Sequence, residues 1–138
     1  MRRTLGILGL VLSYALASCG HDQARHSVAT VRTIQILDVV SPDRLYAKPG
    51  EEIRWQNLRQ NSIRVGFFTM QLLDKLTCEK GVANFWGGVN DLVTIPPGGS
   101  ISLCFARSGV LQYNVWFDPD NPKGTISPMA AIDVEAGG

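Results

Sequence analysis

The sequence contains few residues of the types that most often carry chemistry. Its 138 residues include three cysteines and two histidines, which is too few for a disulfide-dense miniprotein and for most multi-metal sites. Charged residues make up only 18% and the formal net charge is +1, so there is no basic footprint for nucleic acid. It has no internal repeat and no low-complexity segment. A chain of this length with 45% apolar residues is expected to form one globular domain.

The N-terminus has an apolar run that is too short to span a bilayer, which needs about 20 residues. Arg2 and Arg3 precede this run, residues 5–17, which ends in small residues and has the pattern of a secretory signal. The sequence Leu16-Ala17-Ser18-Cys19 resembles a bacterial lipobox. That resemblance implies cleavage before Cys19, lipid on its sulfur and a membrane anchor. The alternative is an ordinary signal peptide in which Cys19 occurs by chance.

The lipobox divides the chain into a lipoprotein signal peptide, a tether and a domain, at residues 1–18, 19–28 and 29–138. Gly20 follows the cysteine where aspartate is the alternative, and in enterobacterial sorting this implies the outer membrane. We expect a bacterial cell-envelope protein, lipid-anchored, with its domain in the periplasm or outside the cell. His21 and His26 lie in the polar tether, where two imidazoles on a flexible segment are a weak candidate for copper or zinc.

The other two cysteines, Cys78 and Cys104, form an even pair in a chain that we expect to be exported. Disulfides persist in an oxidising compartment, so the pair predicts a disulfide. The closed loop of about 26 residues is worth about 3 kcal/mol in the chain-entropy model. The alternative, two reduced thiols in a metal site, has no nearby histidine or third cysteine to support it.

From residue 29 onward, apolar and polar residues alternate in short runs separated by turn residues. Period-two alternation is typical of half-buried strands, and seven or eight such runs predict an all-β sandwich. Two segments break the alternation: the leucines of residues 70–76 predict a short helix, and the glycine-rich residues 78–90 predict a loop. We expect strands at residues 31–40, 44–47, 52–57, 63–68, 92–95, 101–106, 111–117 and 129–134.

The large aromatic residues on apolar positions of these runs are core candidates: Trp55, Phe67, Phe105 and Tyr113. A sandwich of this size also suits an immunoglobulin-like adhesion or assembly module. In that fold a tryptophan lies between the two bridged cysteines, whereas Trp55 precedes both cysteines here. The immunoglobulin-like alternative is therefore less favoured.

Four segments occur in an order that a known family shares. They are residues 41–57, with the Lys-Pro-Gly-Glu turn and a Trp-x-Asn ending, residues 95–105, residues 109–113 and residues 129–134. Together they resemble the cupredoxins, the blue-copper family that includes plastocyanin and azurin. The resemblance covers residues 31–135 and implies a Greek-key β-sandwich, cupredoxin-like, with one short helix or loop insertion.

The resemblance does not extend to the copper ligands. A blue-copper site uses two histidines, a cysteine thiolate and a weak axial ligand such as methionine. The positions that match the first histidine, the cysteine and the second histidine hold Ile63, Val115 and Asp118. Met129 alone matches the axial position, and residues 29–138 contain no histidine. We therefore predict a degenerate domain with no metal site and no cofactor.

The domain also lacks the constellations that mark an enzyme. It has no histidine to act as a general base, and its hydroxyl groups have no activating partner at a recognisable spacing. Asp118 and Asp120 are too few to hold calcium without several carbonyl ligands. We predict no catalytic residue and no enzymatic activity.

Two sets of residues are candidates for contact with a partner. A polar, basic set suits an anionic partner, or is simply a solvated strand and its turn: Arg54, Asn57, Arg59, Gln60, Asn61 and Arg64. An aromatic set either marks a partner surface or covers an open end of the sandwich: Phe68, Phe85, Trp86 and Trp116.

These observations favour a membrane-anchored lipoprotein whose domain binds a protein partner in the envelope or serves a structural role. Nucleic acid is not an expected partner. The alternative is a copper-binding electron carrier or copper chaperone with atypical ligands: His21, His26, Met70 and Met129.

Overall fold

The computed structural model describes residues 29–69, 72–74, 76–82, 91–121 and 123–136. The expected signal peptide and tether lie outside these residues, as do Phe85 and Trp86 of the aromatic set. No helix in the described part of the chain is long and apolar enough to cross a membrane.

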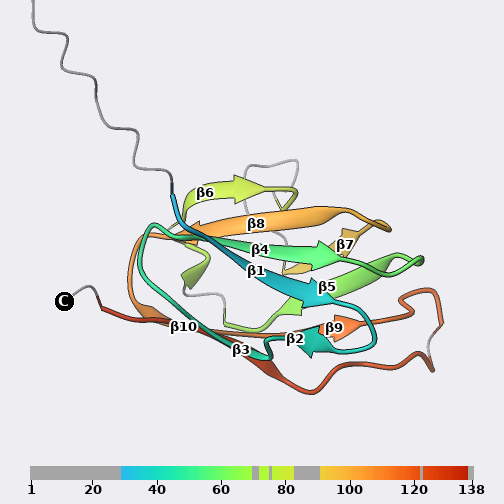
Figure 1. Ribbon diagram of the computed structural model, residues 1–138. Helices are drawn as coiled ribbons and strands as arrows, with labels where there is room; N and C mark the ends of the chain where they lie inside the picture. Colours follow the sequence, from blue (N-terminus) through green and yellow to red (C-terminus); the bar gives the residue numbers. More distant parts are fainter. Residues whose placement is uncertain (1–28, 70–71, 75, 83–90, 122, 137–138) are drawn as a thin grey trace, which may run out of the picture.

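The described residues form ten β-strands. Their bounds are Val31–Ile36 (β1), Val40–Ser41 (β2), Arg44–Ala47 (β3), Glu52–Asn57 (β4), Ile63–Phe67 (β5), Leu76–Lys80 (β6), Leu92–Ile95 (β7), Ser100–Phe105 (β8), Gly109–Trp116 (β9) and Ala130–Val134 (β10). The strands make two five-stranded sheets that face each other (Figure 1). Sheet A has the order β2-β1-β4-β8-β6, and sheet B has the order β3-β10-β9-β5-β7. The predicted all-β sandwich is confirmed.

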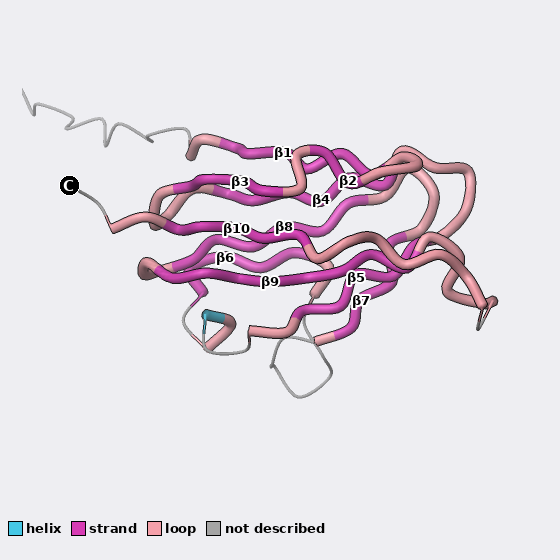
Figure 2. The backbone as a smooth tube through the Cα atoms, turned by 90° about the horizontal axis from the view of Figure 1, so that it is seen from below, coloured by secondary structure: helices cyan, strands magenta, loops and turns pink. Residues whose placement is uncertain are grey.

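The chain changes sheets repeatedly, so that neighbouring strands in a sheet come from distant parts of the sequence. The pairs β1–β4 and β3–β10 are parallel, while the other pairs are antiparallel. Figure 2, a view turned by 90°, shows the strands of both sheets running along the length of the molecule, with the longest connections gathered at its ends. The loops at these ends therefore hold the segments that are candidates for function.

Alternation within a strand decides which residues enter the core. In β4, Ile53, Trp55 and Asn57 are buried, while the residues between them are partly exposed. Trp55 packs edge-on against Phe67, with 5.4 Å between ring centroids, and against Tyr113 at 5.7 Å. Phe105 is also buried, so all four predicted core aromatics are confirmed.

Three expectations about individual elements are corrected by the structure. The predicted strand at residues 31–40 is a hairpin, in which β1 pairs with β2 and Ile36 lies opposite Val40. The sequence there has no glycine or proline to reveal the turn. The predicted loop after residue 77 begins with a strand, because Cys78 lies within β6. As an edge strand with few buried side chains, β6 has little alternation to detect.

The third correction concerns the short helix predicted over residues 70–76. Within that segment, Leu72 and Leu73 are buried in the core and lie in a turn, and Leu76 already begins β6. The leucines thus point to a real burial requirement, but strand β6 takes the last of them. Residues 70, 71 and 75 lie outside the described residues.

Candidate functional site

The two cysteines of the domain are joined, and the prediction of a Cys78–Cys104 disulfide is confirmed. The bond links β6 to β8 at positions that lie directly opposite each other in the antiparallel ladder. Strand β6 forms an edge of sheet A and has only β8 as a neighbour. The disulfide therefore fastens an edge strand to the body of the sheet.

The positions that match the family's metal ligands lie around the β9 end of sheet B. Ile63 begins β5 and Val115 lies near the end of β9, and both side chains are fully buried in the core. Asp118 is exposed in the connection after β9. Met129 is 53% exposed just before β10. The two inner positions therefore offer only hydrocarbon.

The turn that joins β4 to β5 at this end is organised by Asn57, whose side chain is fully buried. Its Nδ2 lies 2.9 Å from the carbonyl oxygen of Asn61 and 3.1 Å from those of Ile95 and Pro96. Its Oδ1 accepts a hydrogen bond of 2.9 Å from the backbone N–H of Arg59. A buried amide with all of its polar atoms engaged avoids the desolvation penalty and fixes the turn.

Arg59 continues from this turn and covers the same end of the sandwich. Its guanidinium carbon lies 5.2 Å from the ring centroid of Phe117, a cation–π arrangement. Nη1 donates to the carbonyl of Leu37 and to Oδ1 of Asp38, each at 2.8 Å. The side chain thus ties the turn before β5 to the β1–β2 hairpin and to the loop after β9.

The long connection from β9 to β10 is fastened by Ser127, which is buried. Its Oγ accepts a hydrogen bond of 2.9 Å from the N–H of Val115, and its backbone N–H donates to the Val115 carbonyl at 2.8 Å. Asn114 Nδ2 donates to the carbonyl of Ser127 at 2.8 Å. The sequence analysis did not single out Asn114 or Ser127, because nothing local distinguishes them from other loop polar residues.

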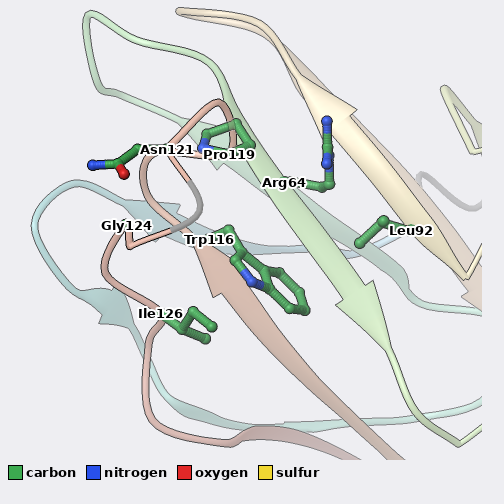
Figure 3. Close-up of a pocket in the computed structure, with 7 residues that line it drawn as sticks. All are labelled: Arg64, Leu92, Trp116, Pro119, Asn121, Gly124 and Ile126. Carbon is green, nitrogen blue, oxygen red and sulfur yellow. The ribbon is translucent and has the colours of Figure 1, made fainter.

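The outer face of sheet B carries a hollow of about 300 Å³ near this end. Figure 3 shows the seven residues that line it. The indole of Trp116 lies across Gly66 on the neighbouring strand: a β-carbon at Gly66 would stand only 2.5 Å from Cζ3 of the indole. Glycine is therefore required here by the close approach of the ring. Leu92 and Ile126, which are 45% and 48% exposed, also line the hollow.

No protein-family model matches the sequence, and no curated protein matches it. Solved structures do match. A reduced form of an amicyanin variant aligns with a TM-score of 0.51 over 80% of this chain and 87% of that chain, at 16% identity. The copper(I) form of another amicyanin variant aligns with a TM-score of 0.50 over 76% and 82%, at 18% identity. The fold is cupredoxin-like.

The residues present do not fit the copper centre that a cupredoxin fold implies. A type-1 site needs two imidazoles and a thiolate, but Ile63 and Val115 present alkyl groups to the core and Asp118 is exposed. Among the described residues, no group of three or more histidine, cysteine or acidic side chains is arranged to hold a metal. Met129 is exposed, and the other atypical ligands considered, His21, His26 and Met70, lie outside the described residues.

The cupredoxin-like fold does not bring the basic residues of the polar set together. Arg54 lies in sheet A and pairs with Glu52 at 2.7 Å, whereas Arg64 lies in sheet B and Arg59 covers the end. The expectation of one basic patch is therefore wrong, because successive strands belong to opposite sheets. Of the aromatic set, Phe68 is 52% exposed and Trp116 lines the hollow.

Proposed function

We propose that this protein is a non-enzymatic, lipid-anchored protein of the bacterial cell envelope, whose cupredoxin-like domain acts as a binding module without a blue-copper centre. The observation that carries the proposal is the complete burial of Ile63 and Val115 at two ligand positions. A metal ligand has to be polar and aimed at a shared point, whereas these side chains belong to the packed core. Electron transfer through type-1 copper is therefore not supported.

The network around this end also supports a role in binding. Arg59, Asn57 and Ser127 hold three connections in place through side-chain hydrogen bonds. Loops fixed on a rigid scaffold are suited to present a binding surface. The hollow beside Trp116 lies on this same scaffold, which gives the proposed module a place to bind a ligand.

Copper titration of the full chain, purified in detergent, tests the loss of the blue-copper centre. Copper(II) is added at one equivalent, excess metal is removed, and both bound copper and visible absorption are measured. We expect no intense red absorption, because no thiolate-to-copper charge transfer is available. Intense absorption with one retained equivalent of copper would overturn this part of the proposal.

Two matched variants separate weak tether binding from a functional atypical site. Copper that is retained by the full chain and lost in the His21→Ala/His26→Ala variant is held by the tether. Copper that persists in that variant and is lost in Met129→Ala would instead support a copper carrier with atypical ligands. We expect Met129→Ala to have no effect, since its exposed thioether is a lone soft donor.

The lipid anchor is tested by mass spectrometry of the N-terminal peptide from protein made in a bacterium. We expect the chain to begin at Cys19 with lipid attached, to fractionate with membranes, and to lose both properties in Cys19→Ala. One acyl chain gives marginal membrane binding and two or more give a stable anchor. Cleavage at another position with an unmodified Cys19 would show that the segment is an ordinary signal peptide.

A further inference from the structure

The hollow on the outer face of sheet B has a floor that depends on two residues of adjacent strands. Gly66 lies in β5 and Trp116 in β9, next to each other across the ladder in which Arg64 is opposite Trp116. Because Gly66 has no side chain, the indole rests directly against the strand, and Leu92 lies against the same glycine from the other side. The result is a flat aromatic surface fixed in orientation by backbone.

Apolar side chains surround this surface and are open to solvent. Ile126 is joined to Trp116 by an isolated antiparallel bridge, and Leu92 lies across from Gly66 in the register of β7. Figure 3 shows the indole between these two side chains. Covering an exposed indole and two exposed aliphatic groups with an apolar ligand is favourable, and aromatic rings pack well on such a surface.

Arg64 supplies the one charged group that lines the hollow. The arginines Arg32, Arg44, Arg54 and Arg59 each pair with a carboxylate within 3.2 Å. Arg64, by contrast, has no carboxylate partner among the described residues and makes only a hydrogen bond of 3.4 Å from Nε to Thr94. Its guanidinium therefore retains donors for an anionic group, which the planar fork binds most strongly when the acceptor is a carboxylate or phosphate.

We propose that this hollow binds a small aromatic carboxylate, with the ring against Trp116 and the carboxylate on Arg64. Its volume of about 300 Å³ is at the small end of ligand pockets and suits a single ring. A monoanion is preferred over a phosphate dianion because Arg64 is one positive charge, while Asp118 and Asp120 flank the lining residue Pro119. The site gives the binding module proposed above a ligand class, and it uses residues other than those of the copper argument.

The probe for this site is 3-phenylpropionate, added to the isotope-labelled full chain in detergent and followed by amide chemical shifts. We expect saturable shifts at Gly66, Gly124 and the Trp116 indole N–H, with a dissociation constant on the order of 1 mM for a ligand of this size. Propionate lacks the ring and 3-phenylpropanamide lacks the charge, so each should bind at least about tenfold more weakly. Phenyl phosphate should also bind more weakly than 3-phenylpropionate.

Variants assign the two halves of the ligand. Arg64→Gln should weaken 3-phenylpropionate binding about tenfold and abolish the advantage over the amide, while Trp116→Ala should remove saturable binding. Arg54→Gln, the matched charge change on the opposite sheet, should have no effect. Gly66→Ala displaces the indole while leaving its chemistry intact, and should weaken binding even if Trp116→Ala fails to fold.

Equal affinity in wild type and Arg64→Gln, tighter binding of phenyl phosphate, or shifts spread over the molecule would overturn the assignment. Such a failure leaves the copper and lipid experiments unaffected, because those report on Ile63, Val115 and Cys19. A positive copper result would in turn refute the proposed loss of the centre without touching this site.

Discussion

The side chain of Asn57 donates a hydrogen bond of 2.9 Å to the main-chain carbonyl of Asn61, four residues later. This contact closes the turn between β4 and β5 and holds Arg59 where it can reach both the β1–β2 hairpin and Phe117. The whole loop end therefore depends on one buried amide, and four changes in the core and sheets test how this architecture is held.

Replacing Asn57 with alanine should lower the free energy of unfolding by about 2–3 kcal/mol, because buried carbonyls and the N–H of Arg59 lose their partner. Urea denaturation followed by circular dichroism measures the loss. Asn61→Ala is the matched control, since its side chain is exposed and its carbonyl remains; we expect a change below about 0.5 kcal/mol. Equal effects in the two variants would contradict a special role for Asn57.

Tyr113 is fully buried, and its hydroxyl has no hydrogen-bond partner among the described residues. Tyr113→Phe should therefore leave stability unchanged or raise it by up to about 1 kcal/mol at neutral pH. Thermal and urea unfolding measure this. A loss larger than about 1 kcal/mol would mean that the hydroxyl has a partner in solution. Tyr46→Phe on exposed β3 is the control and should have no effect.

Burial also raises the pKa of the Tyr113 phenol above its ordinary value near 10. A raised folded-state pKa contributes stability below the unfolded value, and this contribution is lost as pH rises above about 10. Wild type should thus lose stability more steeply than Tyr113→Phe at alkaline pH. Parallel unfolding free energies for the two proteins above pH 10 would refute the effect.

Ser102 donates a hydrogen bond of 2.8 Å to Glu52; this bond, assisted by Arg54, lowers the pKa of that carboxyl. A lowered pKa gives stability above the unfolded value near 4.3, and the contribution is lost as pH falls. Ser102→Ala should therefore destabilise the protein at neutral pH by less than about 1 kcal/mol, since Glu52 is partly solvated, and by less still at acid pH. The measurement is the urea midpoint at both pH values.

Glu79→Gln on β6 is the control for that experiment, because this exposed carboxylate has no ion pair among the described residues. It should show no pH-dependent difference from wild type. A Ser102→Ala loss that is the same at neutral and acid pH would show that the hydroxyl acts through packing alone.

Removing the disulfide by Cys78→Ala/Cys104→Ala should cost about 3 kcal/mol by the chain-entropy model, given the sequence separation of 26. The loss should be largest at β6, which has only β8 as a neighbour in its sheet. Hydrogen exchange should therefore accelerate in β6 before β4. Cys19→Ala, outside the domain, should leave stability unchanged, and uniform acceleration across the sheet would contradict local stapling of the edge.

Much of the fold follows from local pattern. Period-two alternation predicts β4, β5 and β9 because one face of each strand is buried, and the same pattern selects Trp55 and Tyr113 for the core. The turn before β4 is equally local: Gly50 takes a φ of 86°, as the Pro-Gly sequence predicts. Strand β6 escaped prediction because an edge strand buries too little for alternation to be read from sequence.

The candidate site was less predictable, because its contacts join residues far apart in the chain. Arg59 was recognised as part of a polar set, but its partner Asp38 lies 21 residues away. Trp116 was expected to face outward, yet nothing in sequence placed its indole on Gly66, since that contact depends on the register between β5 and β9.

The sequence by itself determined the all-β class, the disulfide pair and the absence of histidine from residues 29–138, because composition and period-two burial are properties of the chain alone. The tertiary structure alone decided that Ile63 and Val115 are sealed in the core and that Arg64, Trp116 and Leu92 line one hollow. Strand order and register set these relationships, and they arise from packing between two sheets whose neighbouring strands are distant in sequence.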